Sequence, residues 1–230
     1  MKILLTNDDG IDAPGLAALE IAARGLGELV VVAPDRHLSG CSHQTTTHRP
    51  LEVRELAPQR YCLDGTPADC VRVALLHLAP DIDVVLSGIN DGGNLGVDVW
   101  MSGTVAAARE AAFYGKRALA ISQYRRRGGE FDTERAATWA QEIIASLLAQ
   151  THDAATFWNI NLPDPVEKTQ PRIVTCPVDQ RPLPIAYDRA DSRFTYRGNY
   201  QAREREAGSD VALCFAGAIT VTQIRLSGGG

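Results

Sequence analysis

The feature that most constrains the fold is a strand, a helix and a second strand within the first 33 residues. Residues 2–6 are a short apolar run, and Pro14 begins a stretch with leucine, isoleucine and alanine at helical spacing. Residues 29–33 form a second continuous apolar run, typical of a strand covered on both faces. Such a βαβ unit has parallel strands and a right-handed crossover. The chain therefore begins as an α/β sheet.

The same alternation of strands and helices continues along most of the chain. A helix is predicted from Pro67, another after Ser102, and a third with Thr133 as its N-cap. Further strands are predicted, in chain order, over 51–56, 60–63, 83–86, 117–122 and 157–162.

The pattern changes after residue 163. Prolines become frequent, and the end of the chain alternates polar and apolar residues over 218–224, as a half-exposed strand does. We therefore predict an α/β fold: a doubly wound, mostly parallel, Rossmann-like sheet in residues 1–163, and a smaller β-rich tail in residues 164–230.

Charge and composition argue against several classes of protein. The net charge of -5 lacks the basic footprint that binding to a nucleic-acid duplex requires. No apolar run approaches the ~18–20 residues of a membrane span, so no membrane partner is expected. The five cysteines are scattered and form no C-x-x-C pair, a pattern typical of free thiols in a reducing compartment. We expect a cytoplasmic protein.

Polar side chains follow three of the predicted strands. Asp8 and Asp9 follow the first strand, Ser39 lies in the long polar loop after the second, and Asn90 follows the strand at 83–86. The carboxyl ends of parallel strands meet at one edge of a sheet, where ligands bind. Carboxylate, hydroxyl and amide oxygens suit a hard divalent cation such as Mn²⁺, Mg²⁺ or Ca²⁺. We hypothesise one such cation on these four residues; the alternative for Asp8 and Asp9 is a solvated turn.

A candidate anion site precedes the alanine-rich helix over 105–112. Ser102, Gly103 and Thr104 stand where a helix N-terminus offers free N–H groups and a positive dipole end. The glycine-rich turn before them adds the side-chain amide of Asn94. An ordinary N-cap is the alternative interpretation. No Gly-Lys-Ser/Thr follows, so this is not a Walker A loop.

The loop after residue 34 carries His37, His43 and His48, which raises the alternative of a zinc site. Their spacing matches no common zinc pattern, and no cysteine pair assists them. A histidine of this loop could instead contact substrate. Cys41 lies in the same loop, but no arrangement of a base beside it identifies a nucleophile.

Taken together, the motifs resemble those of the SurE family of stationary-phase survival proteins, which are 5′-nucleotidases. The matching segments, in the order of the family, are residues 2–11 and 13–15, 32–36, 39–40, 65–70, 87–90, 94–96, 102–108 and 159–163. The resemblance implies a metal-dependent phosphatase that hydrolyses nucleoside 5′-monophosphates to nucleoside and phosphate.

The resemblance also implies roles for individual residues. The metal ligands of the family fall on Asp8, Asp9, Ser39 and Asn90. Its phosphate contacts fall on Asn94, Ser102, Gly103 and Thr104. The attacking nucleophile is either water or Asp8 itself. The resemblance further implies a homodimer or homotetramer in which C-terminal segments are exchanged between subunits.

Two other functions stay open at this point. A phosphatase of the haloacid-dehalogenase type needs an Asp-x-Asp order and a downstream lysine, whereas Asp8 and Asp9 are adjacent and the only lysines are Lys2, Lys116 and Lys168. A non-catalytic nucleotide sensor would use the same pocket without turnover.

Overall fold

The computed structural model describes residues 1–126, 129, 131–153, 155–164 and 170–226. The elements in chain order are β1 (Lys2–Thr6), α1 (Pro14–Ala23), β2 (Glu28–Pro34), β3 (Val53–Ala57), β4 (Arg60–Leu63), α2 (Pro67–Val73), the π-helical turn η1 (Ala74–Leu78), β5 (Val84–Asp91), the 3₁₀ turn η2 (Gly96–Trp100), α3 (Gly103–Phe113), β6 (Arg117–Gln123), α4 (Thr133–Leu148), β7 (Thr156–Leu162), β8 (Ile173–Thr175), β9 (Tyr187–Ala190), β10 (Arg193–Tyr196), the 3₁₀ turn η3 (Tyr200–Ala202), α5 (Asp210–Phe215) and β11 (Ile219–Arg225).

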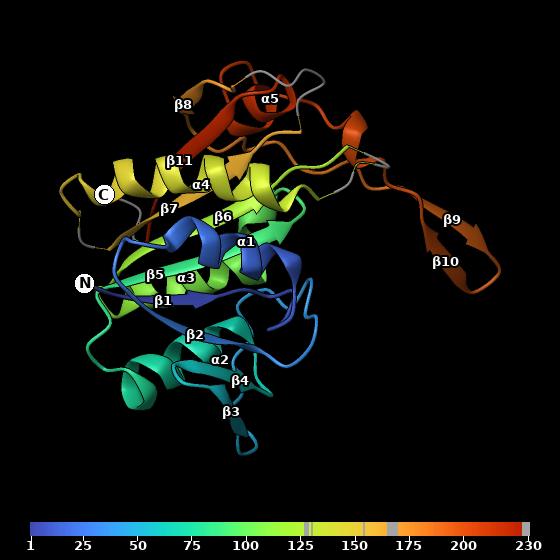
Figure 1. Cartoon of the computed structure of the whole chain (residues 1–230). Helices are drawn as coiled ribbons and strands as arrows, with labels where there is room; N and C mark the ends of the chain where they lie inside the picture. The colour runs from blue at the N-terminus through green and yellow to red at the C-terminus, as the bar shows by residue number, and fades with distance from the viewer. Residues whose placement is uncertain (127–128, 130, 154, 165–169, 227–230) are drawn as a thin grey trace.

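A mixed sheet forms the centre of the molecule, with strand order β3-β4-β2-β1-β5-β6-β7-β11-β8. The six strands from β4 to β7 in this order are parallel to one another. β3 runs antiparallel to β4, and β11 runs antiparallel to β7. Helices α1 and α4 cover one face and α2 and α3 the other (Figure 1). This confirms the predicted doubly wound, mostly parallel α/β fold.

The first strand shows why its sequence is apolar without interruption. Successive side chains of a strand point to opposite faces of the sheet. Ile3 and Leu5 join the core beneath α1 and α4, while Leu4 joins the core beneath α2 and α3. All three are fully buried. A sheet that buries both faces requires apolar residues at every position of its central strands.

The C-terminal part of the chain contributes to the same sheet. β8 and β11 extend it beyond β7, so residues on both sides of position 163 share one sheet. The hairpin β9–β10 projects away from the body (Figure 1). The division at residue 163, and a role of the tail in oligomerisation, stay predictions.

Several element boundaries differ from the sequence expectation. The N-cap of α4 is Asp132, whose side chain accepts a hydrogen bond from the Arg135 N–H at 3.0 Å, whereas Thr133 is the first helical residue. The predicted strand 51–56 is β3, shifted to Val53–Ala57, and the strand at 83–86 continues to Asp91. The long loop after β2 forms no helix or strand until Val53, two residues beyond the predicted start of the next strand at 51. Among the described residues, none of the helices has the length and apolarity to cross a membrane.

Candidate active site

The candidate site lies where the sheet changes the direction of its winding. β1 is flanked by β2 on one side and by β5 on the other, and all three are parallel. Asp8 and Asp9 follow β1, the loop with Ser39 follows β2, and Asn90 lies near the end of β5. The three strand ends therefore meet at one edge, as predicted, and at the kind of position where open α/β sheets bind ligands.

A side-chain-closed turn presents the two adjacent carboxylates. The Asn7 amide donates to the Gly10 carbonyl oxygen at 2.9 Å, and the Gly10 N–H donates back to Asn7 Oδ1 at 3.2 Å. Gly10 has a φ of 104°, a conformation that favours glycine. Asn7 is fully buried, so the turn is anchored in the core and Asp8 and Asp9 lie at its tip.

Asp8 is a buried carboxylate that faces the first turn of α3. Its side chain is almost completely buried, and Thr104 Oγ1 donates a hydrogen bond to its Oδ1. Burial raises the pKa of Asp8 to about 6; the hydrogen bond from Thr104 opposes this rise, and the nearby charge of Asp9 adds to it. Asp8 is therefore ionised at neutral pH while held in a poorly solvated position.

The first turn of α3 packs directly against this carboxylate. Ser102 is the N-cap, and its hydroxyl accepts a hydrogen bond from the Val105 N–H at 3.0 Å. A Cβ at Gly103 would lie 2.9 Å from Asp8 Cβ and Oδ2 and from Cys41 Sγ. A larger residue at this position would force Asp8 or Cys41 to shift, so glycine allows the first turn of α3 to pack closely on Asp8.

Cys41, which the sequence places only in the loop after β2, lies beside the first turn of α3. Burial raises the pKa of its thiol to about 11, and the charge of Asp8 contributes to the rise. A thiol that stays protonated at neutral pH is a poor nucleophile. Cys41 therefore packs beside Gly103 without serving as a nucleophile.

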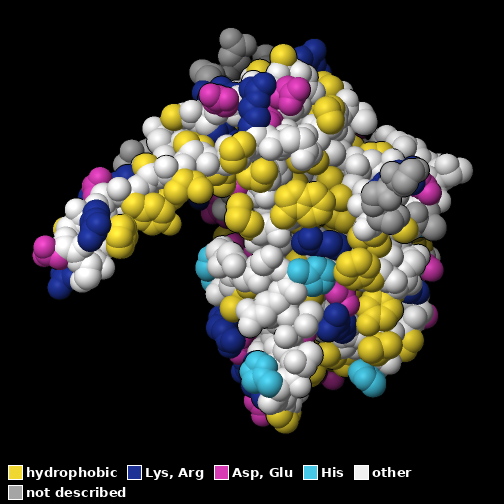
Figure 2. Space-filling view, turned by 180° about the vertical axis from the view of Figure 1, so that it is seen from behind, with side chains coloured by type: hydrophobic (Ala, Val, Ile, Leu, Met, Phe, Trp, Pro, Cys, Tyr) yellow, Lys and Arg dark blue, Asp and Glu magenta, His cyan; other side chains and the backbone are white. Residues whose placement is uncertain are grey.

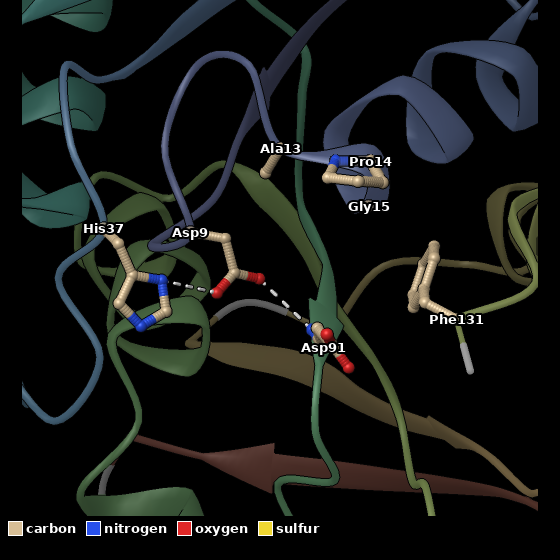
Figure 3. Close-up of a pocket in the computed structure, with 7 residues that line it drawn as sticks. All are labelled: Asp9, Ala13, Pro14, Gly15, His37, Asp91 and Phe131. Carbon is tan, nitrogen blue, oxygen red and sulfur yellow. Dashed lines mark hydrogen bonds and ion pairs between the residues drawn. The ribbon is translucent and has the colours of Figure 1, made fainter. Parts of the chain in front are cut away.

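Asp9 connects the ends of all three strands. Its Oδ1 lies 3.1 Å from His37 Nδ1, in the loop after β2. Its Oδ2 accepts a hydrogen bond at 3.2 Å from the backbone N–H of Asp91 on β5 (Figure 3). The sequence did not single out Asp91, although its place directly after Asn90 was a usable signal.

The other two predicted ligands are placed less directly. The Asn90 amide nitrogen donates to the Gly92 carbonyl oxygen at 2.6 Å, which leaves the amide oxygen to act as a ligand. Ser39 is exposed and follows Leu38, whose N–H donates to the Asp8 carbonyl oxygen at 2.7 Å. No hydrogen bond joins the Ser39 side chain to Asp8 or Asp9 in the part of the chain that the structure describes.

Asn94 is held at the centre of a buried amide cluster. Its N–H donates to Asn161 Oδ1 at 2.8 Å, and its side-chain amide donates to Ser122 Oγ at 2.7 Å. Its carbonyl oxygen accepts from the amides of Asn159 and Asn161 at 2.9 and 3.0 Å. The sequence pattern predicts no role for Asn159 and Asn161, although two amides within the buried strand β7 are a signal of such a cluster.

The loop after β2 is clamped against α2 and α3. His43 Nε2 lies 2.6 Å from Glu110 Oε2, and Arg72 Nε donates to the other oxygen of this buried carboxylate at 2.6 Å. The backbone N–H of Thr46 donates to Asp69 Oδ1 at 3.0 Å. These contacts fix the path of the segment that carries Ser39 and Cys41. Sequence reasoning missed them because they join distant parts of the chain.

The donor set fits a hard cation. Among the described residues, neither Asp8 nor Asp9 forms an ion pair with lysine or arginine, and the one ion-pair partner in contact is His37. Buried charges are normally paired or coordinated to a metal, so this uncompensated charge favours a bound cation. The available ligand atoms are oxygens, which Mg²⁺, Mn²⁺ and Ca²⁺ prefer.

The alternative zinc site does not form within the described residues. No group of three or more His, Cys, Asp or Glu side chains there is placed to hold a metal ion. His37 contacts Asp9, which follows β1, and His43 contacts Glu110 of α3. These two loop histidines therefore face different parts of the structure.

Comparisons with known proteins identify relatives of the whole chain. The family model described as "Survival protein SurE" matches residues 3–182. A protein of Nostoc sp. named "Putative 5'-nucleotidase alr3139" is 50% identical over 228 residues, which cover 98% of this chain and 100% of that protein. The protein of Geotalea daltonii named "5'-nucleotidase SurE" is 40% identical over 234 residues, 98% of this chain and 93% of that one.

A solved structure is similar over the whole chain. The crystal structure of the SurE protein from Aquifex aeolicus superimposes with a TM-score of 0.90 at 32% sequence identity, and the match covers 100% of this chain and 95% of that one. Fold, motifs and sequence similarity thus lead to one conclusion: the chain belongs to the SurE family.

Proposed function

We propose that the chain is a 5′-nucleotidase, a phosphoric monoester hydrolase that converts nucleoside 5′-monophosphates to nucleoside and phosphate. Asp8, Asp9, Ser39 and Asn90 would hold one divalent cation per subunit. The observation that carries the proposal is Asp8, a buried and ionised carboxylate without a lysine or arginine partner in the described chain, packed on the N-terminal turn of α3. The names of the relatives, "5'-nucleotidase SurE", support the reaction.

Several residues have separate roles in binding and hydrolysing the phosphate ester. The backbone N–H groups at Gly103 and Thr104 bind phosphate oxygens, and the dipole of α3 favours the negative charge that they carry. Asn94 orients the phosphate through the second N–H of its side-chain amide, since the first donates to Ser122 Oγ. A divalent cation, when bound, supplies a Lewis acid that polarises a phosphate oxygen. Thr104 holds Asp8 in one orientation through the hydrogen bond to Oδ1.

The balance of the reaction is simple. The bond from phosphorus to the 5′-oxygen breaks and a new P–O bond forms to water or to Asp8. The leaving oxygen takes a proton from the attacking water in the first route and from a solvent water in the second, so one water is consumed for each nucleoside and phosphate released. If Asp8 attacks, the phosphoaspartate is then hydrolysed by water. Acid quenching of the reaction with labelled substrate distinguishes the two routes, because only the second leaves phosphate bound to the protein.

The test is the release of phosphate from 5′-AMP, assayed in turn with Mn²⁺, Mg²⁺ and Ca²⁺ and with excess EDTA. We expect activity with at least one cation and its loss in EDTA. Asp9→Asn should abolish activity without unfolding the chain, whereas Asp12→Asn, the same change at an exposed position nearby, should not. Equal activity in EDTA would remove the cation from the proposal. Nucleotide binding without release under any cation would favour a sensor.

We also propose an assembly and a location for the chain. The hairpin β9–β10 projects from the body and carries hydrophobic side chains on its surface (Figure 2). They include Tyr187, Phe194 and Tyr196, each of which is more than half exposed. Exposed apolar patches of this kind are typical of interfaces. This supports a homodimer or homotetramer that exchanges C-terminal segments, to be checked by light scattering of the wild type and of Phe194→Ser. The cysteines, all free thiols, support a cytoplasmic location.

A further inference from the structure

A cavity of about 280 Å³ opens beside Asp9 (Figure 3). Its polar side is formed by Asp9, His37 and Asp91, and its apolar side by Pro14 and Phe131. The cavity lies just below the range of about 300–1,000 Å³ for sites that bind drug-sized ligands, so it suits a compact one. None of the residues on its apolar side has a part in the cation or phosphate site proposed above.

The position of the cavity identifies what part of a substrate could enter it. Asp9 is both a wall of the cavity and a proposed cation ligand. A phosphate held at Asp8, Asp9 and α3 therefore has the cavity as its neighbour, and the group esterified to that phosphate can occupy it. A second cavity of about 190 Å³ is lined by residues such as Arg36, His48 and Arg49, and neither Asp8 nor Asp9 lines it.

The walls of the cavity suit a nucleoside. Phe131 is partly buried against the core beneath α1 and α4, so its ring has a fixed support. In Figure 3 this ring and Pro14 lie on the side of the cavity away from His37, where they offer apolar surface to a planar base. Aromatic rings stack on any base because every base presents a π face.

The polar side of the cavity suits the hydroxyl groups of a ribose. Arg125 pairs with both carboxylate oxygens of Asp91, with Nη2 at 2.7 Å from Oδ2, and this pairing fixes the carboxylate in one orientation. An ionised carboxylate only accepts hydrogen bonds, so it recognises O–H and N–H donors. Together with Asp9 it also disfavours a second phosphate at this end of a substrate.

We propose that this cavity is the nucleoside subsite, with the base against Phe131 and Pro14 and the ribose hydroxyls at Asp91. The proposal rests on the proposed function, and it makes two residues of this chain determinants of specificity. Phe131 selects substrates that carry a base, and Asp91 selects ribonucleotides over 2′-deoxyribonucleotides.

The experiment compares Phe131→Ala with the wild type on 5′-AMP and on ribose 5-phosphate, which lacks the base. We expect kcat/KM for 5′-AMP to fall by about tenfold or more, since stacking on an aromatic ring contributes ~1–3 kcal/mol per base, while kcat/KM for ribose 5-phosphate is unchanged. Asp91→Asn should reduce the preference for 5′-AMP over its 2′-deoxy analogue by about tenfold, as expected for a hydrogen bond to a charged group. His48→Ala, in the second cavity, is the control and should change neither ratio.

Equilibrium binding of adenosine separates a failed subsite from a failed function. Adenosine should bind the wild type, and Phe131→Ala should weaken that binding about tenfold whether or not the chain turns over 5′-AMP. An equal loss on both substrates, unchanged adenosine binding, or a selective effect of His48→Ala would overturn the subsite. Absence of 5′-AMP hydrolysis in the wild type, with adenosine binding still sensitive to Phe131→Ala, would overturn the proposed function alone.

Discussion

Replacing Asp8 with asparagine should make the metal-free protein more stable while it abolishes activity. Asparagine has the same shape and can still accept the hydrogen bond from Thr104, but it carries no charge. The pKa of Asp8, about 6 in the folded chain against 3.8 for an ordinary aspartate, corresponds to a cost of about 3 kcal/mol for keeping the charge buried at neutral pH. Burial of the asparagine amide offsets about 1 kcal/mol of this.

A net gain of about 2 kcal/mol is therefore expected, equivalent to a rise in Tm of about 4–8 °C for a chain of this length. The pH dependence has a defined sign. Because the pKa of Asp8 is higher in the folded chain, the folded state binds more protons between pH 3.8 and about 6, and wild-type stability falls as the pH rises through this window. The advantage of Asp8→Asn should be complete at pH 8 and fall to about one third at pH 5, because the cost of the buried charge halves while the cost of the amide stays the same.

The assay is thermal unfolding of the wild type and the variant in EDTA at both pH values. Asp12→Asn, at an exposed position, is the control and should shift Tm by little. Added Mn²⁺ should raise the Tm of the wild type, by about 2.7 kcal/mol of stability at 100 times its Kd, but not that of Asp8→Asn. If Asp8→Asn is no more stable than the wild type at pH 8 in EDTA, the reasoning from buried charge is refuted.

Three further predictions concern the contacts around Asp8 and the loop after β2. Gly103→Ala should lower kcat/KM for 5′-AMP at least tenfold, because the new Cβ would lie 2.9 Å from Asp8 atoms; a variant with wild-type kinetics would contradict the packing. Thr104→Val should lower kcat/KM about 10–100-fold, because it removes the hydrogen bond to the Asp8 carboxylate, whereas Thr104→Ser keeps this hydrogen bond. Equal kinetics of the two variants would show that the Thr104 hydroxyl has no role. His43→Phe should lower the free energy of unfolding by about 1–3 kcal/mol in urea titrations, because it leaves one oxygen of buried Glu110 without its hydrogen-bond donor. Adding Glu110→Gln to this variant should recover part of the lost stability. No recovery would argue against the unpaired carboxylate as the cause.

Part of the candidate site could be predicted because its signals are local. The run Lys2–Thr6 followed by a polar turn places Asp8 and Asp9 after a buried strand. Ser102 before an alanine-rich segment marks a helix start, and the structure confirms its hydroxyl as the N-cap. Both signals depend on neighbours within a few positions. The exact residue of a cap is less secure, since Asp132 and Thr133 are both residues that favour this role.

Contacts between distant segments could not be predicted in this way. Hydrophobic periodicity says that β7 is buried, but it does not say that Asn159 and Asn161 hold the backbone of Asn94. Nor does it say that β11 pairs antiparallel with β7 and continues the central sheet. Both depend on which loops and edges are brought together after the strands have paired.

The amino-acid sequence alone predicts a mostly parallel sheet with helices on both faces. It also predicts acidic and amide side chains at three strand ends. Both predictions succeed because burial and helix capping depend on residues that are close in the sequence. Only the tertiary structure decided that Asp8 faces Gly103 and Thr104 of α3, and that Phe131 closes a cavity beside Asp9. These pairs are separated by about a hundred residues, and only the packing of helices onto a common sheet brings such distant side chains within contact.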